Sequence, residues 1–185
     1  MADLKILGIC GSLRKNSYNM SALRACGELL PQGMSLQITN LADIPMFNQD
    51  VFDAGLPPAV KRFRDEIVAA DGLLIASPEY NFSLTAALKN AIDWASRPPN
   101  QSWQDKPVAI FSVTPGPLGG ARVQYDVRRI LGQLWAPVLP RPEVFIGASA
   151  SKFADGKLTD ETTRKFLTDL LAGFKPWIER MRLKK

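Results

Sequence analysis

Short apolar runs alternate along the chain with longer stretches in which apolar residues recur every three or four positions. The short runs predict β-strands at residues 5–10, 35–41, 72–77, 107–114 and 143–148. Several of these runs are almost continuously apolar, which is typical of strands that are buried on both faces. The pattern therefore indicates a parallel sheet that is covered by helices on both sides.

The longer stretches predict helices that begin near residues 20, 57, 83, 121 and 159. Pro57 and Pro58 suit the start of the second helix, because a first-turn N–H has no partner within the helix. In the last helix, Pro176 is expected to cause a kink. The side chains expected to face the core are Leu23, Leu30, Val60, Phe63, Ile67, Val68, Leu84, Leu88, Ile92, Phe166, Leu170, Phe174, Ile178 and Met181.

Regular alternation of strands and helices with short connections predicts a doubly wound α/β fold with right-handed crossovers. Five strands in 185 residues favour the flavodoxin-like strand order 2-1-3-4-5 over the six-stranded dinucleotide-binding order. No repeat or interdomain linker interrupts the pattern. We therefore expect residues 1–185 to form one domain.

The chain contains no histidine, which excludes several kinds of catalytic site. Neither a Ser-His-Asp nor a Cys-His arrangement is possible, and a histidine-ligated zinc or iron site is excluded as well. Cys10 and Cys26 are not spaced as a CxxC motif, and we expect both to be small buried hydrophobic residues. No metal site is expected. An enzyme of this composition must rely on carboxylates or on a cofactor.

The net charge of +5 favours anionic partners, such as nucleic acid or a phosphorylated cofactor. The basic residues Arg180, Arg182, Lys184 and Lys185 suit the C-terminus of a helix. No basic run is interleaved with aromatic residues, so we do not expect nucleic acid as a partner. No apolar run approaches the roughly 18 residues of a membrane helix, and no signal peptide is recognisable at the N-terminus. We expect a cytoplasmic protein without a membrane partner.

Three loops follow the first, third and fourth strands, at the edge where doubly wound sheets bind ligands. The first, GSLRKNSYN (11–19), combines backbone N–H groups, hydroxyls and Arg14, which suit a phosphate monoester. It is neither a P-loop nor a GxGxxG motif, and Asn16 stands where a low-molecular-weight phosphatase would need an arginine. Taken alone, the loop fits equally well a solvated turn with Ser17 or Asn19 as the N-cap.

The second loop, Pro78-Glu79-Tyr80-Asn81, offers a tyrosine ring on which a flat ligand could stack, although Tyr80 could equally be packing within a turn. The third loop, residues 114–120, is rich in glycine, which lets the backbone approach a ligand closely. A phosphate at the first loop and a flat polar ring between the other two indicate FMN.

The segments GSLRKNSYN, ADIPMFNQD (42–50), PEYNFSLTAALKNAIDW (78–94) and SVTPGPLGGAR (112–122) resemble the NADPH-dependent FMN reductase family, especially its bacterial quinone and chromate reductases. Pro115 and Pro117 depart from the family pattern by removing two backbone donors, and Thr85-Ala86 stands where relatives often have Pro-Gly. The resemblance implies a phosphate loop at Ser12, Arg14, Ser17, Tyr18 and Asn19, an isoalloxazine loop at Pro78, Glu79, Tyr80, Asn81 and Phe82, and a ring site closed by Thr114, Gly116 and Gly119.

The resemblance also implies a ping-pong oxidoreductase. NADPH or NADH would pass a hydride to FMN, and a quinone, free flavin, azo dye or metal oxyanion such as chromate would then be reduced in the same place. FMN would carry the chemistry, so no catalytic side chain is expected, and Glu79 is expected to be structural. The helix after the third loop is expected to favour negative charge on the reduced ring. The alternatives are a flavodoxin-type electron carrier or sensor, and a protein that keeps the fold without a cofactor.

Homodimers or homotetramers are usual in the family that the chain resembles. The candidate interface comprises the helix around Lys89, Asp93 and Trp94 and the helix that carries Tyr125, because tryptophan, tyrosine and arginine are enriched in tight interfaces. Arg97, Arg128 and Arg129 would complete it. Trp94 is equally compatible with packing inside one subunit.

Overall fold

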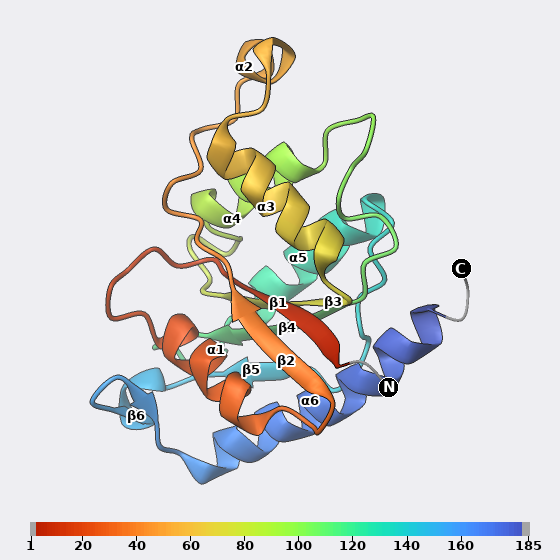
Figure 1. Ribbon diagram of the computed structural model, residues 1–185. Helices are drawn as coiled ribbons and strands as arrows, with labels where there is room; N and C mark the ends of the chain where they lie inside the picture. Colours follow the sequence, from red (N-terminus) through yellow and green to blue (C-terminus); the bar gives the residue numbers. More distant parts are fainter. Residues whose placement is uncertain (1–2, 183–185) are drawn as a thin grey trace.

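The main sheet joins five parallel strands in the order β2-β1-β3-β4-β5, which confirms the predicted flavodoxin-like topology (Figure 1). The computed structural model describes residues 3–182. The chain reverses its winding between β1 and β3, so the topological switch point lies beside these two strands. The strands are β1 (Leu4–Cys10), β2 (Met34–Ile38), β3 (Gly72–Ser77), β4 (Val108–Val113) and β5 (Val144–Ile146).

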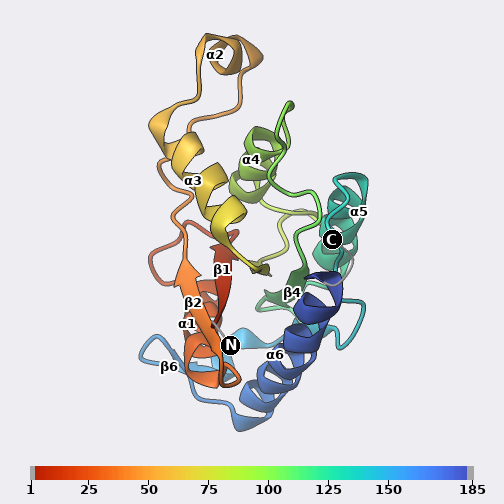
Figure 2. The ribbon, with the colours of Figure 1, turned by 45° about the vertical axis from the view of Figure 1, so that its right-hand side comes forward.

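Helices cover both faces of the sheet (Figures 1 and 2). One face packs against α1 (Tyr18–Leu29) and α6 (Glu161–Arg182), and the other against α3 (Pro58–Ala69), α4 (Ala86–Ala95) and α5 (Ala121–Gln133). In β1, Ile6 and Cys10 join the first core while Leu7 and Ile9 join the second. Both sides of each central strand are therefore buried, which explains the nearly continuous apolar runs.

Several predicted boundaries and faces are wrong in detail. Helix α4 begins at Ala86 instead of near Ser83, because Thr85 caps it and accepts a bond from the Leu88 N–H at 3.2 Å. Val68 and Phe166, which were expected to face the core, are 62% and 50% exposed. Both lie one position away from a core residue, a rotation of about 100° around the helix axis. Pro176 lies inside α6, which continues to Arg182, and the expected kink at this residue stays a prediction.

Three further short elements were not predicted. They are α2 (Gln49–Ala54), a 3₁₀ turn at Ser149–Ser151, and a hairpin of β6 (Phe153–Ala154) and β7 (Lys157–Leu158). Asp155 and Gly156 form the hairpin turn with φ of 48° and 75°, a conformation that this residue pair favours. Asn48 caps α2 by accepting from the Asp50 N–H at 2.8 Å.

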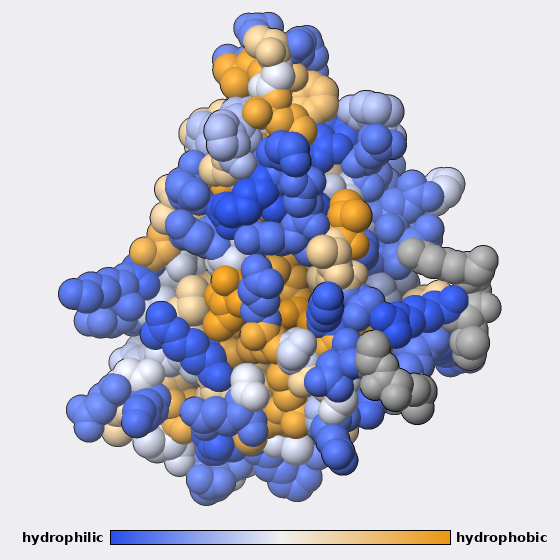
Figure 3. All heavy atoms as spheres, viewed as in Figure 1, coloured by the Kyte–Doolittle hydropathy of each residue, from blue (hydrophilic) through white to orange (hydrophobic). Residues whose placement is uncertain are grey.

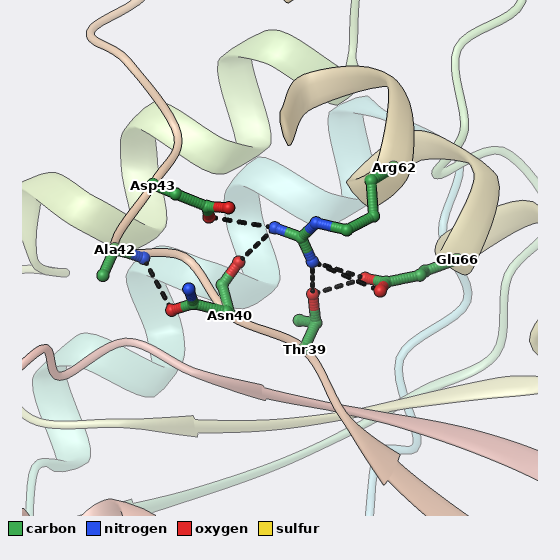
Figure 4. Close-up of polar contacts among 6 residues, drawn as sticks. All are labelled: Thr39, Asn40, Ala42, Asp43, Arg62 and Glu66. Atoms are coloured by element: carbon green, nitrogen blue, oxygen red, sulfur yellow. Dashed lines mark hydrogen bonds and ion pairs between the residues drawn. The ribbon is translucent and has the colours of Figure 1, made fainter. Parts of the chain in front are cut away.

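Helix α2 lies at the tip of a projecting segment, residues 42–56, which we call the arm (Figure 1). Arg62 of α3 holds the start of the arm by donating to the Asn40 carbonyl at 2.8 Å and to Asp43 Oδ1 at 3.0 Å (Figure 4). The same guanidinium contacts Thr39 and Glu66, each at 3.2 Å. These side chains fix the chain where it leaves β2.

Trp94 of α4 holds the arm from the other side. Its ring is fully buried, its Nε1 donates to the Pro45 carbonyl at 2.7 Å, and it packs edge-on against Phe47. The proposal that Trp94 lies in a subunit interface is therefore wrong, because the side chain is already enclosed within one chain. Asn90, one turn earlier, also bonds to Pro45 and Phe47.

Two features of the surface are an apolar patch and a basic helix terminus. Apolar atoms gather beside β2, where a cavity of about 530 Å³ lies between β1, β2 and α3 (Figure 3). Arg180 and Arg182 lie in the last turn of α6, as expected, while Lys184 and Lys185 fall outside the described residues. Within residues 3–182, we find no helix whose length and apolar character would let it cross a membrane.

Candidate functional site

Three loops meet at the carboxyl edge of the sheet, and side-chain hydrogen bonds join them in pairs. Loop 1 comprises residues 11–17, loop 2 residues 78–85 and loop 3 residues 114–120. Thr85 joins loops 1 and 2 by donating to the Gly11 carbonyl at 2.6 Å. Asn19 joins the helix after loop 1 to Val113, the residue before loop 3. Glu79 joins loop 2 to the helix after loop 3. The three loops therefore form one connected unit.

Loop 1 leaves a cation and backbone donors free. Ser17 is the N-cap of α1 and accepts from the Met20 N–H at 3.3 Å, while buried Ser12 accepts from the Arg14 N–H at 3.4 Å. Within residues 3–182, the exposed Arg14 guanidinium contacts no acceptor, and the N–H groups of Tyr18 and Asn19 have no protein partner. A helix N-terminus with an unpaired arginine suits a phosphate group.

The Asn19 side chain is not available to a phosphate. It is 3% exposed, its Nδ2 donates to the Val113 carbonyl at 2.8 Å, and its Oδ1 accepts from the Val113 N–H at 3.0 Å. Both ends of the amide are thus used by the last residue of β4. Asn19 therefore positions loop 1 against loop 3. The expectation that its side chain contacts the cofactor directly is corrected.

Tyr18 also packs within the protein. Its ring lies 4.8 Å from the Phe153 ring of the β6–β7 hairpin, measured between centroids. Beside this pair, a cavity of about 490 Å³ opens next to loop 1 and reaches Arg14 and Asn16. The Tyr18 ring therefore forms a wall of the space beside the phosphate loop.

Loop 2 presents aromatic rings to solvent. Tyr80 and Ser83 exchange two backbone hydrogen bonds of 3.0 Å, and the intervening Asn81 and Phe82 have φ of 49° and 66°. This is the pattern of a type I′ turn. Tyr80 and Phe82 are 47% and 67% exposed, so flat apolar surface is available to a ring, whereas Pro78 is buried.

Glu79 caps α5, the helix that follows loop 3. Its Oε2 accepts from the backbone N–H groups of Arg122 at 3.0 Å and Val123 at 3.2 Å, and its Oε1 accepts from Arg122 Nη1 at 3.1 Å. These contacts are in keeping with the expected structural role of Glu79, which stays a prediction. The helix after loop 3 was expected to favour negative charge on the reduced ring. Glu79 takes two of its first N–H groups, and the effect of this helix on a bound ring stays a prediction.

Loop 3 combines an open part and a tightly packed part. A Cβ at Gly116 would meet no atom within 4 Å, so the backbone there is open to a ligand, and Thr114 is half-buried beside it. A Cβ at Gly119 would lie 2.6 Å from the Phe145 carbonyl carbon. The glycine at 119 is thus required by packing against β5 and by its φ of 60°, not by a ligand.

Two residues that the sequence interpretation did not assign to the site complete it. Thr85 could have been found as an N-cap threonine before an apolar helix. Arg122 has no local sequence signal, since its role depends on Glu79 and on Phe82, whose ring centroid lies 4.1 Å from its guanidinium carbon. Within residues 3–182, no three His, Cys, Asp or Glu side chains are grouped as metal ligands would be.

The fold and the loops fit FMN. Arg14, which has no partner within residues 3–182, and the open helix N–H groups suit its phosphate, while the exposed aromatic rings of loop 2 and the open backbone at Gly116 of loop 3 suit its ring. A flavodoxin-like sheet with such a site defines a flavoprotein of the FMN-binding class.

The chain belongs to the NADPH-dependent FMN reductase family, whose model matches residues 4–151. It is 47% identical over 181 residues to an NAD(P)H-dependent FMN reductase of Pseudomonas aeruginosa, covering 97% of this chain and 98% of the relative. A quinone reductase of Pseudomonas putida is 44% identical over 173 residues, 92% of each chain. The flavoenzyme NAD(P)H:acceptor oxidoreductase of Paracoccus denitrificans superposes with a TM-score of 0.88 at 35% identity, covering 96% and 98%. The resemblance inferred from the four segments is confirmed.

Proposed function

We propose that this chain is an FMN-dependent NAD(P)H oxidoreductase that reduces quinones and related two-electron acceptors. The observation that carries the proposal is the contrast between two helix N-termini at the site. The N-terminus of α1 is open beside an unpaired Arg14, whereas that of α5 is closed by Glu79. The open N-terminus of α1 beside Arg14 suits the phosphate of FMN.

In the proposed mechanism, Arg14, Ser12 and the first N–H groups of α1 hold the FMN phosphate. Tyr80, Asn81, Phe82, Thr114 and Gly116 would hold the ring. FMN supplies the hydride chemistry when bound, so the side chains need only bind, orient and exclude water. The nicotinamide and the acceptor would bind in turn at the same place, which would give ping-pong kinetics.

The proposal extends to the whole chain. We place residues 1–185 in one FMN-binding domain and the protein in the cytoplasm, where the two free, buried cysteines are in keeping with a reducing compartment. NADPH or NADH is the donor. Free flavins, azo dyes and chromate are further acceptors within the proposal, because an open ring face selects little by shape.

Anaerobic spectroscopy tests the proposal. The purified protein is expected to show flavin absorption, which NADPH bleaches within the mixing time and which a quinone then restores. A spectrum that NADPH leaves unchanged over minutes would instead fit an electron carrier. A colourless protein that does not bind added FMN would overturn the proposal altogether.

Replacing Arg14 with alanine is expected to weaken FMN binding by about 1.5–3 kcal/mol, the usual contribution of a hydrogen bond to a charged group. The effect should be much smaller for riboflavin, which lacks the phosphate. Fluorescence titration of apoprotein with both flavins measures it. Lys15→Ala, the neighbouring cation on the same loop, is the matched control. An unchanged Kd for FMN in Arg14→Ala would show that the guanidinium is only a surface charge.

Assembly is a separate part of the proposal. Exposed Lys89 on α4, exposed Arg129 on α5 and half-buried Arg97 line a cavity of about 290 Å³, and with the exposed Tyr125 on α5 they offer an interface. A homodimer or homotetramer would complete the nicotinamide site with residues of the neighbour. Sedimentation at micromolar concentration is expected to give an oligomer, and dilution should reduce activity. A fully active monomer would contradict both statements.

A further inference from the structure

A charged pair lies between loops 2 and 3. The three contacts of Glu79 come from donors on Arg122 and Val123 alone, and its side chain is 11% exposed. Partly buried charges are screened much less by salt than charges in open solvent. The Arg122 side chain is 47% exposed and lies over the Phe82 ring. One negative and one positive group therefore stand at the ring site, the carboxylate being the more enclosed.

The Glu79 carboxylate also offsets the partial positive charge at the N-terminus of α5. A helix N-terminus carries roughly half a positive charge, which favours an anion close to the first turn. At α5, the N–H of Ala121 is bonded to the Leu118 carbonyl, and the next two N–H groups are bonded to Glu79. At α1, by contrast, Tyr18 and Asn19 keep their N–H groups free of protein partners within residues 3–182. Of these two helices, only α1 has an electropositive N-terminus at the site, and this N-terminus lies beside the proposed phosphate position.

Resting on the proposed function, we infer that Glu79 and Arg122 together set the reduction potential of bound FMN. Hydride transfer from the nicotinamide brings two electrons and one proton, so FMN gains one negative charge until a second proton arrives. A neighbouring carboxylate disfavours that charge and a guanidinium favours it. Glu79 therefore lowers the potential and Arg122 raises it. With Glu79 in place, reduced FMN is the stronger donor to its acceptors.

The test is the midpoint potential of bound FMN in Glu79→Gln, in Arg122→Met and in the double variant. Glutamine keeps the shape and one acceptor oxygen but removes the charge. We expect Glu79→Gln to shift the equilibrium at least tenfold toward reduced FMN, which equals about 30 mV for a two-electron couple. Arg122→Met should shift it in the opposite direction, and the double variant should return close to the wild-type value.

Binding provides a second readout, which does not depend on turnover. The ratio of the Kd values for oxidised and reduced FMN must change by the same factor as the redox equilibrium, because the two are linked thermodynamically. Asp169→Asn removes the carboxylate of an exposed ion pair with Lys165 on α6. This control should leave both the potential and the Kd ratio unchanged.

Two variants that both leave the potential unchanged, or that shift it in the same direction, would show that the pair acts only as a cap of α5. If the pair acts only as a cap, the two variants should lower the free energy of unfolding without shifting the midpoint potential in opposite directions. If Glu79→Gln does not fold, Arg122→Met decides alone, and an unchanged or raised potential overturns the inference. Failure of the wild type to bind FMN would overturn the proposed function as well, which distinguishes the two failures.

Discussion

Replacing Trp94 with alanine is expected to destabilise the protein by about 3–5 kcal/mol, the usual cost of removing a fully buried tryptophan. The ring is 0% exposed and packs against Phe47 and Phe52, and its Nε1 bonds to the Pro45 carbonyl. The change therefore leaves a large cavity at the base of the arm and removes one of the donors to that carbonyl. Urea unfolding followed by circular dichroism measures the loss.

Trp135→Ala is the matched control, because this tryptophan is 69% exposed. Its replacement should change the free energy of unfolding by about 0.5 kcal/mol or less. A loss below about 1 kcal/mol in Trp94→Ala would mean that the arm does not depend on the ring beneath it.

Replacing Asn19 with leucine is expected to reduce both stability and FMN affinity. The leucine leaves the N–H and the carbonyl of Val113 without their partner, and each buried unsatisfied group costs about 1–3 kcal/mol. The same bonds fix loop 1 relative to loop 3. Without them, the distance between the phosphate site and the ring site is no longer fixed. We expect the Kd for FMN to rise at least tenfold, about 1.4 kcal/mol.

Asn90 provides a control with the same chemistry at another place. Its Nδ2 donates to the Pro45 carbonyl at 2.8 Å and its Oδ1 accepts from the Phe47 N–H at 2.7 Å. Asn90→Leu should cost a similar amount of stability while leaving the FMN affinity within about twofold. Equal losses of affinity in the two variants would indicate general loosening of the fold, and would contradict a positioning role for Asn19.

The sheet could be predicted from sequence because both of its faces are buried, so the central strands are apolar throughout. The arm and the β6–β7 hairpin could not, since α2 buries none of its residues and the hairpin strands are two residues long. In such segments the backbone conformation depends on side-chain caps and turn residues and not on hydrophobic periodicity. The Asp155-Gly156 pair was a usable turn signal.

The site was predicted as three loops but not as a connected unit. Gly119 was assigned to a ligand because glycine allows close approach, yet the neighbour that approaches it is the backbone of β5. The family resemblance placed Asn19 and Glu79 among the ligand contacts, although polar residues beside helix N-termini serve ligands and caps equally. Which use applies depends on residues far apart in sequence, such as Val113 and Arg122.

The two cysteines bear on the chemical durability of the protein. Quinones alkylate thiolates, so an enzyme that releases or encounters them is at risk wherever it exposes a reactive sulfur. Here Cys10 and Cys26 are 3% and 0% exposed, and burial raises the pKa of both thiols, that of Cys26 to about 12. Burial and raised pKa together disfavour the reactive thiolate at both cysteines, so neither is a ready target for an electrophilic quinone.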